Sequence, residues 1–377
     1  MNIPNWRIAL ITRRDPYANS VKPKEMESFL LKRGYQVDEW DSLSIGRHLV
    51  FGLPVPRLNL NAILLYLHEL LWAFVRVALR SANLKLLRSV QGRLLNRILR
   101  LRGAVLADQL VTGNYRAVIC ESSLDMAVFL GRRIAQTQIL DLPVPWVDEI
   151  YYGDQLTVTT YRILSSLQRD CYTAADRVSF HWNTYVDFVE SKSPGGRNWL
   201  NCSYGVSKKN LRAKFALPPR IVFLGNLEGY WVNLPLLEEL CRIYPDLDVW
   251  GGPDPGPESG LNYRGYASDL DIMADYQFGL ITITDDPLRC SSFSSKHLEY
   301  ASYGLPVLTP CWRTDEILGP SSIYYHPDNF LDVIAEYSSE TSWGVKSEQS
   351  LAVANELSWN AAFRDLGELI DDRHSRP

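Results

Sequence analysis

The 377-residue sequence has little that would mark a secreted, membrane-spanning or metal-binding protein. Its six cysteines are scattered, with no Cys-x-x-Cys pair and no histidine at zinc spacing. This excludes a zinc ribbon and a disulfide framework and indicates reduced thiols in a cytoplasmic protein. No apolar run reaches the ~18 uncharged residues of a membrane-spanning helix. The apolar residues 8–11 are too few for the hydrophobic region of a signal peptide, so they predict a buried first strand.

The common nucleotide-binding loops are missing as well. There is no Gly-x-Gly-x-x-Gly and no phosphate-binding loop ending in Lys-Ser or Lys-Thr, which counts against dinucleotide and NTPase chemistry. The net charge of −4 argues against nucleic acid as a partner. Asp246-Leu247-Asp248 and Asp269-Leu270-Asp271 mimic a metal site, but their positions before a strand and at a helix start predict solvated turns or caps. We therefore expect no metal and no cofactor.

The small net charge conceals a strongly basic segment. Residues 47–102 hold nine arginines and one lysine against one glutamate, a net charge of +9, which leaves −13 for the remainder. The segment 42–110 is longer than a simple crossover between strands needs, and we expect one or two long helices over 61–82 and 84–102, inserted into the first half. Its cations interleave with leucines, which favours docking on an anionic membrane surface over packing against a partner subunit. The docking residues would be Arg88, Arg93, Arg97 and Arg100.

Outside this segment, short apolar runs alternate with amphipathic stretches, which implies parallel strands joined by right-handed crossovers. Interruptions near Pro194 and at Pro218-Pro219 indicate two doubly wound α/β halves that meet near residue 200. Such sheets bind ligands at the carboxyl ends of their strands, so two facing halves would share a cleft. The predicted strands are 7–12, 36–40, 117–120, 138–142, 177–180, 220–224, 248–251, 278–282 and 306–309. The predicted helices are 22–33, 234–243, 269–275 and 296–303.

The most informative stretch is Ser294-Ser295-Lys296-His297-Leu298-Glu299-Tyr300, followed by Gly304-Leu305-Pro306-Val307. Two small hydroxyl residues open a helix whose free N–H groups and positive dipole end suit a diphosphate. Lys296 in the first turn is unfavourable against that dipole unless an anion binds there. Glu299, one turn further on, can accept hydrogen bonds from two ribose hydroxyls. The alternative is a simple helix cap at Ser295 with a solvated Lys296.

This pattern resembles the nucleotide-sugar signature of the family 4 type of GT-B glycosyltransferases, in which the Glu binds the donor ribose and the helix start binds the diphosphate. The resemblance extends over most of the chain outside the basic segment. It identifies Gly225 and Asn226 with the loop after the donor domain's first strand, and Tyr266 with the loop whose backbone contacts the nucleobase. It also matches 204–206 to the hinge that closes the first domain, and 358–366 to the terminal helix that crosses back to it.

The resemblance implies a GT-B fold: α/β, with two facing Rossmann-like domains, parallel sheets and a cleft between them. Residues 1–206 would bind the acceptor and include the basic insertion 42–110. Residues 207–357 would bind the nucleotide sugar, and 358–377 would form the helix that crosses back. The implied donor site comprises Gly225, Asn226, Tyr266, Ser294, Ser295, Lys296 and Glu299.

The chain departs from the family pattern at two places. Typical members have a Glu eight residues before the ribose Glu, where this chain has Ser291. Many have Arg and Lys in the loop after Gly225, where residues 226–231 contain neither; Lys296 could supply that cation. A more distant resemblance, to the glucuronosyltransferases of exopolysaccharide assembly, has a Lys at this spacing and lacks the early Glu. That group inverts the anomeric configuration, whereas family 4 retains it, so the stereochemistry stays open.

Inversion requires a general base within hydrogen-bond reach of the acceptor hydroxyl. The position that the resemblance assigns to it falls near Val144 and Pro145, which cannot serve. The remaining candidates are Asp141 at a strand end, Asp148 and the adjacent Glu149 one loop further on, and Asp15 after the first strand. Retention needs no base, and stabilisation of the leaving diphosphate would then do most of the work.

The resemblance thus implies a metal-independent, hexosyltransferase-like enzyme. Its donor would be a nucleoside diphosphate-sugar, with a UDP-sugar favoured and a GDP-sugar as the alternative. Its acceptor would be membrane-associated, such as a lipid-linked glycan in polysaccharide or glycolipid biosynthesis. We expect it in the cytoplasm, peripherally attached to the inner face of the membrane. A GT-B nucleotide-sugar epimerase and a non-catalytic binding or scaffold protein are the alternatives.

Overall fold

The structure is a computed structural model that describes residues 6–12, 21–41, 60–81, 85–195, 198–229, 231–292 and 294–372, with backbone only for 41, 73–81 and 85–90. The chain divides into two compact units. Unit 1 comprises Met1–Ser203 and Phe363–Pro377, and unit 2 comprises Tyr204–Ala362. The domain boundaries expected from the sequence fall at 206 and 357.

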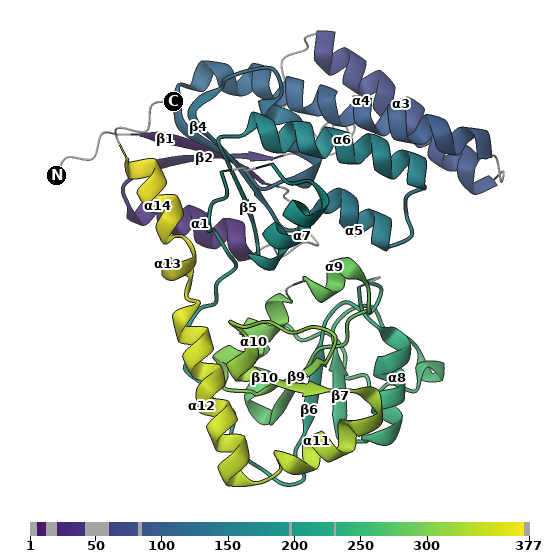
Figure 1. Cartoon of the computed structure of the whole chain (residues 1–377), viewed down its shortest axis with the longest axis vertical. Coiled ribbons are helices and arrows are strands. Elements are labelled where there is room, and N and C mark those ends of the chain that lie inside the picture. The colour runs from purple at the N-terminus through teal and green to yellow at the C-terminus, as the bar shows by residue number, and fades with distance from the viewer. Residues whose placement is uncertain are drawn as a thin grey trace. The chain divides into compact units, whose positions relative to one another are not determined.

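Unit 1 is built on a parallel five-stranded sheet in the order β2-β1-β3-β4-β5. Its central strand residues, such as Ile8–Ile11 in β1, are completely buried, as expected for a parallel sheet covered by helices on both faces. The strands are β1 (Arg7–Thr12), β2 (Gln36–Asp41), β3 (Tyr115–Cys120), β4 (Ala135–Leu142) and β5 (Arg177–Phe180). The helices are α1 (Val21–Lys32), α3 (Leu60–Ser81), α4 (Lys85–Leu110), α5 (Trp146–Tyr152), α6 (Val158–Ala174), α7 (Thr184–Lys192) and α14 (Arg364–Asp371) (Figure 1).

The basic segment forms an antiparallel pair of helices, α3 and α4, but only one of them is peripheral. α4 runs eight residues past the predicted end at 102 and packs against α6 and the 3₁₀ helix Ser123–Phe129. The approach is close: a Cβ atom at Gly103 would lie 2.4 Å from the backbone of Ala127. Arg102 is buried there, and its guanidinium pairs with Asp125 at 3.2 Å. α4 is therefore the crossover helix between β2 and β3, whereas α3 packs mainly on α4.

Unit 2 repeats the architecture, with a parallel sheet in the order β10-β9-β8-β6-β7. Its strands are β6 (Ile221–Leu224), β7 (Leu247–Trp250), β8 (Phe278–Leu280), β9 (Val307–Pro310) and β10 (Ser322–Tyr325). Its helices are α8 (Leu234–Ile243), α9 (Pro287–Cys290), α10 (Ser295–Ser302), α11 (Phe330–Glu336), α12 (Glu340–Glu356) and α13 (Trp359–Ala362). All nine predicted strands are present; β10 was not predicted, and 270–275 is a 3₁₀ rather than an α helix.

Two segments matched by resemblance, 204–206 and 358–366, come together. Val206 N donates a hydrogen bond of 2.9 Å to Leu357 O, and a Cβ atom at Gly205 would lie 2.9 Å from the backbone of Trp359. After α13 the chain enters unit 1, where Phe363 packs on Phe29 with ring centroids 5.5 Å apart. From Phe363 on, the terminal segment therefore belongs to unit 1.

Candidate functional site

The start of α10 is open, as a diphosphate site requires. The helix begins at Ser295, with Ser294 at the N-cap position, no side chain that caps it and no acidic residue in the first turn. Tyr300 fixes its place, because the buried phenol oxygen accepts a hydrogen bond of 2.7 Å from Leu224 N at the end of β6. The aromatic ring lies over Gly279, where a Cβ atom would be 2.3 Å from it. The helix start is thus held at the carboxyl edge of the unit 2 sheet.

Lys296 and Glu299 form an ion pair on this helix, with Nζ 2.7 Å from Oε2. Both side chains are partly shielded, at 32% and 13% exposure. The pair places a cation beside the open N–H groups and a carboxylate one turn away.

The loop after β6 lies beside α10 through the same Tyr300–Leu224 bond. Gly225 N donates to Trp250 O at 3.0 Å, and Asn226 Oδ1 accepts from Glu228 N at 3.1 Å, so the loop is a tight turn against the end of β7. Gly251 has a φ of +100° and donates to Gly265 O at 2.9 Å. The next residue, Tyr266, is 69% exposed. All seven predicted donor-site residues therefore belong to segments at one edge of one sheet.

Two arginines outside the sequence motif also lie near the carboxyl edge of the unit 2 sheet. Arg289 is buried in α9, with its guanidinium carbon 6.0 Å from the ring of Trp231 in the β6 loop. Arg313 is also buried, and its Nε donates to Ser292 O at 2.8 Å, just before α10 begins. Because they come from segments on either side of α10, no fixed spacing in the sequence marks them.

Unit 1 carries a buried polar cluster at the carboxyl edge of its own sheet. Lys22 and Asp141 have completely buried side chains, and Nζ lies 2.8 Å from Oδ1. Nζ also donates to Cys202 O at 2.5 Å, and Ser179 Oγ donates to Asp141 at 2.6 Å. Burial, the largest single effect, lowers the pKa of Lys22, but the charge and hydrogen bond of Asp141 together with the nearby Cys202 and Glu121 raise it overall. The Asp141 carboxylate is thus paired inside unit 1 and has no exposed surface for an acceptor hydroxyl.

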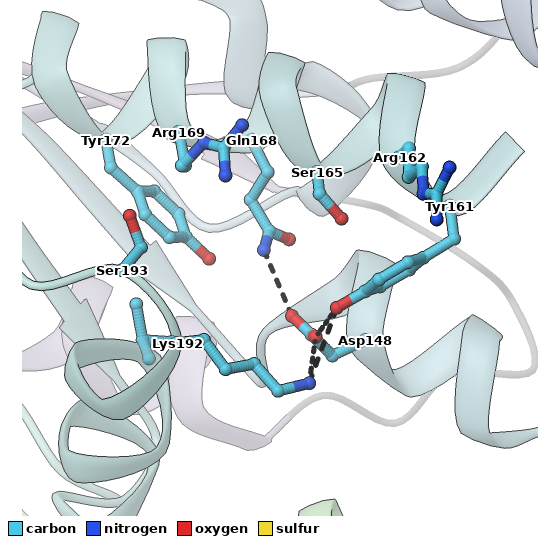
Figure 2. Close-up of a pocket in the computed structure, with 10 residues that line it drawn as sticks. Asp148, Tyr161, Arg162, Ser165, Gln168, Arg169, Tyr172, Lys192 and Ser193 are labelled. Atoms are coloured by element: carbon cyan, nitrogen blue, oxygen red, sulfur yellow. Dashed lines mark hydrogen bonds and ion pairs between the residues drawn. The ribbon is translucent and has the colours of Figure 1, made fainter. Parts of the chain in front are cut away.

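Asp148, at the start of α5, is likewise held by several donors (Figure 2). Its carboxylate accepts from Tyr161 Oη at 2.8 Å, Lys192 Nζ at 2.9 Å and Gln168 Nε2 at 3.3 Å. Burial would lower the pKa of Lys192, but the hydrogen bond and charge of Asp148 raise it overall. Unlike Asp141, Asp148 lines an open pocket.

Several predicted residues lie elsewhere or outside the described residues. Asp15 is not among the described residues, and neither is the side chain of Arg88. Arg100 forms an exposed ion pair of 2.7 Å with Asp170 on α6. Arg93 and Arg97 are exposed and form no ion pair within the described part of the chain.

No group of three or more His, Cys, Asp or Glu side chains suited to a metal ion occurs among the described residues. The sequence predicts a solvated turn at Asp248, and this prediction is wrong: Asp248 lies in β7. Its buried carboxylate accepts hydrogen bonds from Arg220, Arg264, Tyr276 and Asn262. The prediction failed because long side chains from three other segments converge on it. Asp269 does cap a helix, accepting from Asp271 N at 2.9 Å.

Stability should fall as the pH drops below about 6.5, because His181 and His297 are buried. Burial, followed by the charges of Lys22 and Arg313 respectively, holds both pKa values well below the ordinary value. Below pH ~6.5 the imidazoles bind protons in the unfolded chain but not in the folded chain. The free energy of unfolding therefore falls below that pH, by up to about 1.4 kcal/mol per pH unit for each imidazole. Urea unfolding at pH 7.5, 6.5 and 5.5 measures this. His297→Gln, which can still bond Ser321, should reduce the slope of the unfolding free energy against pH by the contribution of one imidazole. An unchanged slope would show that His297 does not contribute to it.

No family model matches the chain, and no curated protein matches it. Solved structures do. A sucrose-phosphate synthase from Thermosynechococcus elongatus superposes with a TM-score of 0.64 at 14% identity, over 97% of this chain and 98% of that chain. The lipopolysaccharide outer core galactosyltransferase WaaB gives 0.59 at 13% identity, over 97% and 99%. The chain has the GT-B fold.

TarM is a third structure of this fold that matches, with a TM-score of 0.52 at 12% identity over 72% of this chain and 58% of that chain. At these identities the comparisons establish the GT-B architecture that the sequence predicted, and the site residues rest on their own geometry. No helix among the described residues is long and apolar enough to cross a membrane.

Proposed function

We propose that this GT-B protein is a glycosyltransferase that uses a nucleoside diphosphate-sugar donor. The observation that carries the proposal is the open start of α10, with Lys296 in its first turn and Glu299 one turn on. Backbone N–H groups at Ser294 and Ser295 and the Lys296 ammonium would hold the diphosphate. Glu299 would accept from the ribose hydroxyls, with Gly225, Asn226 and Tyr266 around the remainder of the nucleotide.

For the chemical step, the fixed positive charge at this helix start would stabilise the diphosphate as it leaves. If the reaction inverts configuration, Asp148 is a better base than Asp141, because it lines an open pocket while Asp141 is closed off by Lys22 and Ser179. We assign Asp141 a positioning role at the sheet edge, and Asp15 stays a candidate base. If the reaction retains configuration, none of the three is needed as a base.

Thermal unfolding with UDP, GDP and ADP, followed by turnover of the matching sugar nucleotides, tests the proposal. We expect UDP to raise the melting temperature most and a UDP-sugar to be consumed only with an acceptor. Consumption without acceptor would indicate an epimerase. No stabilisation by any of the three nucleotides would indicate a scaffold protein.

We further propose that the acceptor lies at a membrane surface, because α3 has apolar side chains on both faces. Ala62 and Leu65 pack on Leu94, Ile98 and Val105 of α4. The outer face carries five large apolar side chains at successive spacings of three, four, three and one, each 48% to 71% exposed: Leu60, Ile63, Leu67, Leu70 and Leu71. An exposed apolar stripe of this kind is typical of interfacial helices, and the cations on α4, Arg93 and Arg97 among them, would favour an anionic leaflet.

Substitution of Ile63, Leu67 and Leu70 by Gln should release the protein from vesicles that contain phosphatidylglycerol. At about 1 kcal/mol for each partly buried side chain, the loss is roughly 100-fold in partitioning, measured by cosedimentation. Arg93→Ala with Arg97→Ala should weaken binding to anionic vesicles only. The matched control is Leu331→Gln with Val345→Gln, two equally exposed apolar residues of unit 2. Equal sedimentation of the triple variant and the wild type would contradict a lipid-facing α3.

A further inference from the structure

A pocket in unit 1 remains outside the donor site. It has a volume of ≈ 410 Å³ and lies between α5, α6 and α7. Figure 2 shows side chains of α6 along one side of it, including Arg162, Ser165 and Arg169, with Asp148 and Lys192 opposite. The pocket is large enough for a sugar residue with one charged substituent.

The charges around the pocket are unbalanced toward the positive. Three cations, Arg162, Arg169 and Lys192, face one carboxylate, that of Asp148. Lys192 is already paired with Asp148 at 2.9 Å. Arg162 and Arg169 make no ion pair and no side-chain hydrogen bond within the described residues. They lie on one side of α6, with their Cα atoms two helical turns apart, about 10.5 Å along the helix axis. An anion entering the pocket therefore meets two guanidinium groups that no described residue pairs with.

The pocket also presents hydroxyl-binding groups. Ser165 lies between the two arginines on α6, and its Oγ is shielded from solvent without a hydrogen-bond partner among the described residues. Buried hydroxyls are nearly always paired, so this oxygen is suited to a ligand hydroxyl. Asp148 accepts three hydrogen bonds, which leaves capacity on a carboxylate with about four acceptor sites.

Aromatic side chains supply the apolar wall. Tyr161 and Tyr172 line the pocket, and Tyr161 is held by stacking on Tyr151 with ring centroids 4.2 Å apart. Pyranose rings present C–H groups on their faces and hydroxyls at their edges. Rigid aromatic rings next to carboxylate, amide and guanidinium groups match both features.

We propose that this pocket binds a saccharide unit that carries a phosphate or a carboxylate. The anionic group lies at Arg162 and Arg169, and the ring hydroxyls at Ser165 and Asp148. We assign this unit to the acceptor, an assignment that rests on the proposed glycosyltransferase function. The binding itself does not depend on that function.

Titration of the full chain by calorimetry and saturation-transfer NMR tests the proposal, with glucose 1-phosphate, glucuronate and methyl glucoside as probes. Saturating UDP is present so that the donor site is occupied. We expect both acidic sugars to bind and methyl glucoside to bind at least tenfold more weakly. Arg162→Ala with Arg169→Ala should weaken the acidic sugars at least tenfold, and Ser165→Ala a few-fold for all three. A preference for glucose 1-phosphate over glucuronate would identify the anion as a phosphate, and the reverse preference a carboxylate.

The control is Lys24→Ala with Lys32→Ala, which removes two exposed positive charges from α1, a helix that does not line the pocket. Equal losses in the two double variants would reduce the effect to general electrostatics and overturn the proposal. Binding of methyl glucoside as tight as that of the acidic sugars would also overturn it, as would no binding of any probe at concentrations on the order of 10 mM. UDP titration is the independent readout: UDP binding without acidic-sugar binding refutes this pocket alone, and the reverse refutes the donor site alone.

Discussion

Replacement of Glu299 by alanine should weaken UDP binding by roughly 100-fold or more. The carboxylate is the group placed to accept from two ribose hydroxyls, and each hydrogen bond to a charged group contributes about 1.5–3 kcal/mol. The effect should be the same for uridine, UMP and UDP, since all three carry the ribose. Calorimetric titration of the three ligands measures it.

Lys296→Met gives the complementary result, because the ammonium is placed to bind phosphate rather than ribose. UDP should bind about tenfold more weakly or worse, while uridine binding changes little. Glu239→Ala, an exposed glutamate of α8, serves as the control and should bind like the wild type. If Glu299→Ala binds UDP as tightly as Glu239→Ala, the donor-site assignment is wrong.

Lys22→Met should destabilise unit 1 by about 3–5 kcal/mol, the second large effect. The substitution leaves the completely buried Asp141 carboxylate without its cation. Replacement of both partners, Lys22→Met with Asp141→Leu, should recover most of the loss because no buried charge is left unpaired. Urea unfolding followed by far-UV circular dichroism and tryptophan fluorescence provides the free energies.

The matched comparison for this ion pair is Arg100 with Asp170, whose side chains are 46% and 48% exposed. Arg100→Ala should cost at most ~1 kcal/mol, because exposed pairs are screened by water. A Lys22→Met protein no less stable than Arg100→Ala would show that the buried cluster does not hold the sheet edge together.

The sequence allowed most of the fold to be predicted because both sheets are parallel and buried. Strands such as β1 and β6 are continuous apolar runs between helices, and these runs are visible without a structure. β10 was missed because its run of strand-favouring residues, Ile323 to Tyr325, is only three residues long; its pairing with β9 makes it a strand. Only tertiary contacts establish that element.

The helices of the basic segment could be predicted from the sequence, but their packing could not. Its charge and leucine content are evident in the sequence, and they predicted one or two long helices docked on a membrane surface. The sequence did not reveal that α4 is packed as a crossover helix, because Gly92 and Gly103 at its contact face carry no apolar signal. As a result Arg100 and Arg102 form ion pairs within unit 1, while the exposed apolar face belongs to α3.

The donor motif could be located because its residues are close in sequence on one helix. Arg289 and Arg313 could not, because they approach α10 from separate segments. The enclosure of Asp141 and the pocket beside Asp148 also depend on groups far apart in the sequence. Lys22, which pairs with Asp141, also donates to the Cys202 carbonyl 180 residues away.

The most direct test of the central claim is transfer of a radiolabelled sugar. The wild-type protein is incubated with labelled UDP-sugars and a lipid-linked glycan extract of its host, beside Glu299→Ala and the Glu239→Ala control. We expect label to pass into the organic-extractable fraction with the wild type and the control, and at least 100-fold more slowly with Glu299→Ala. Equal transfer by all three proteins, or no consumption of any UDP-, GDP- or ADP-sugar by the wild type, would contradict the assignment of this GT-B chain as a nucleotide-sugar glycosyltransferase.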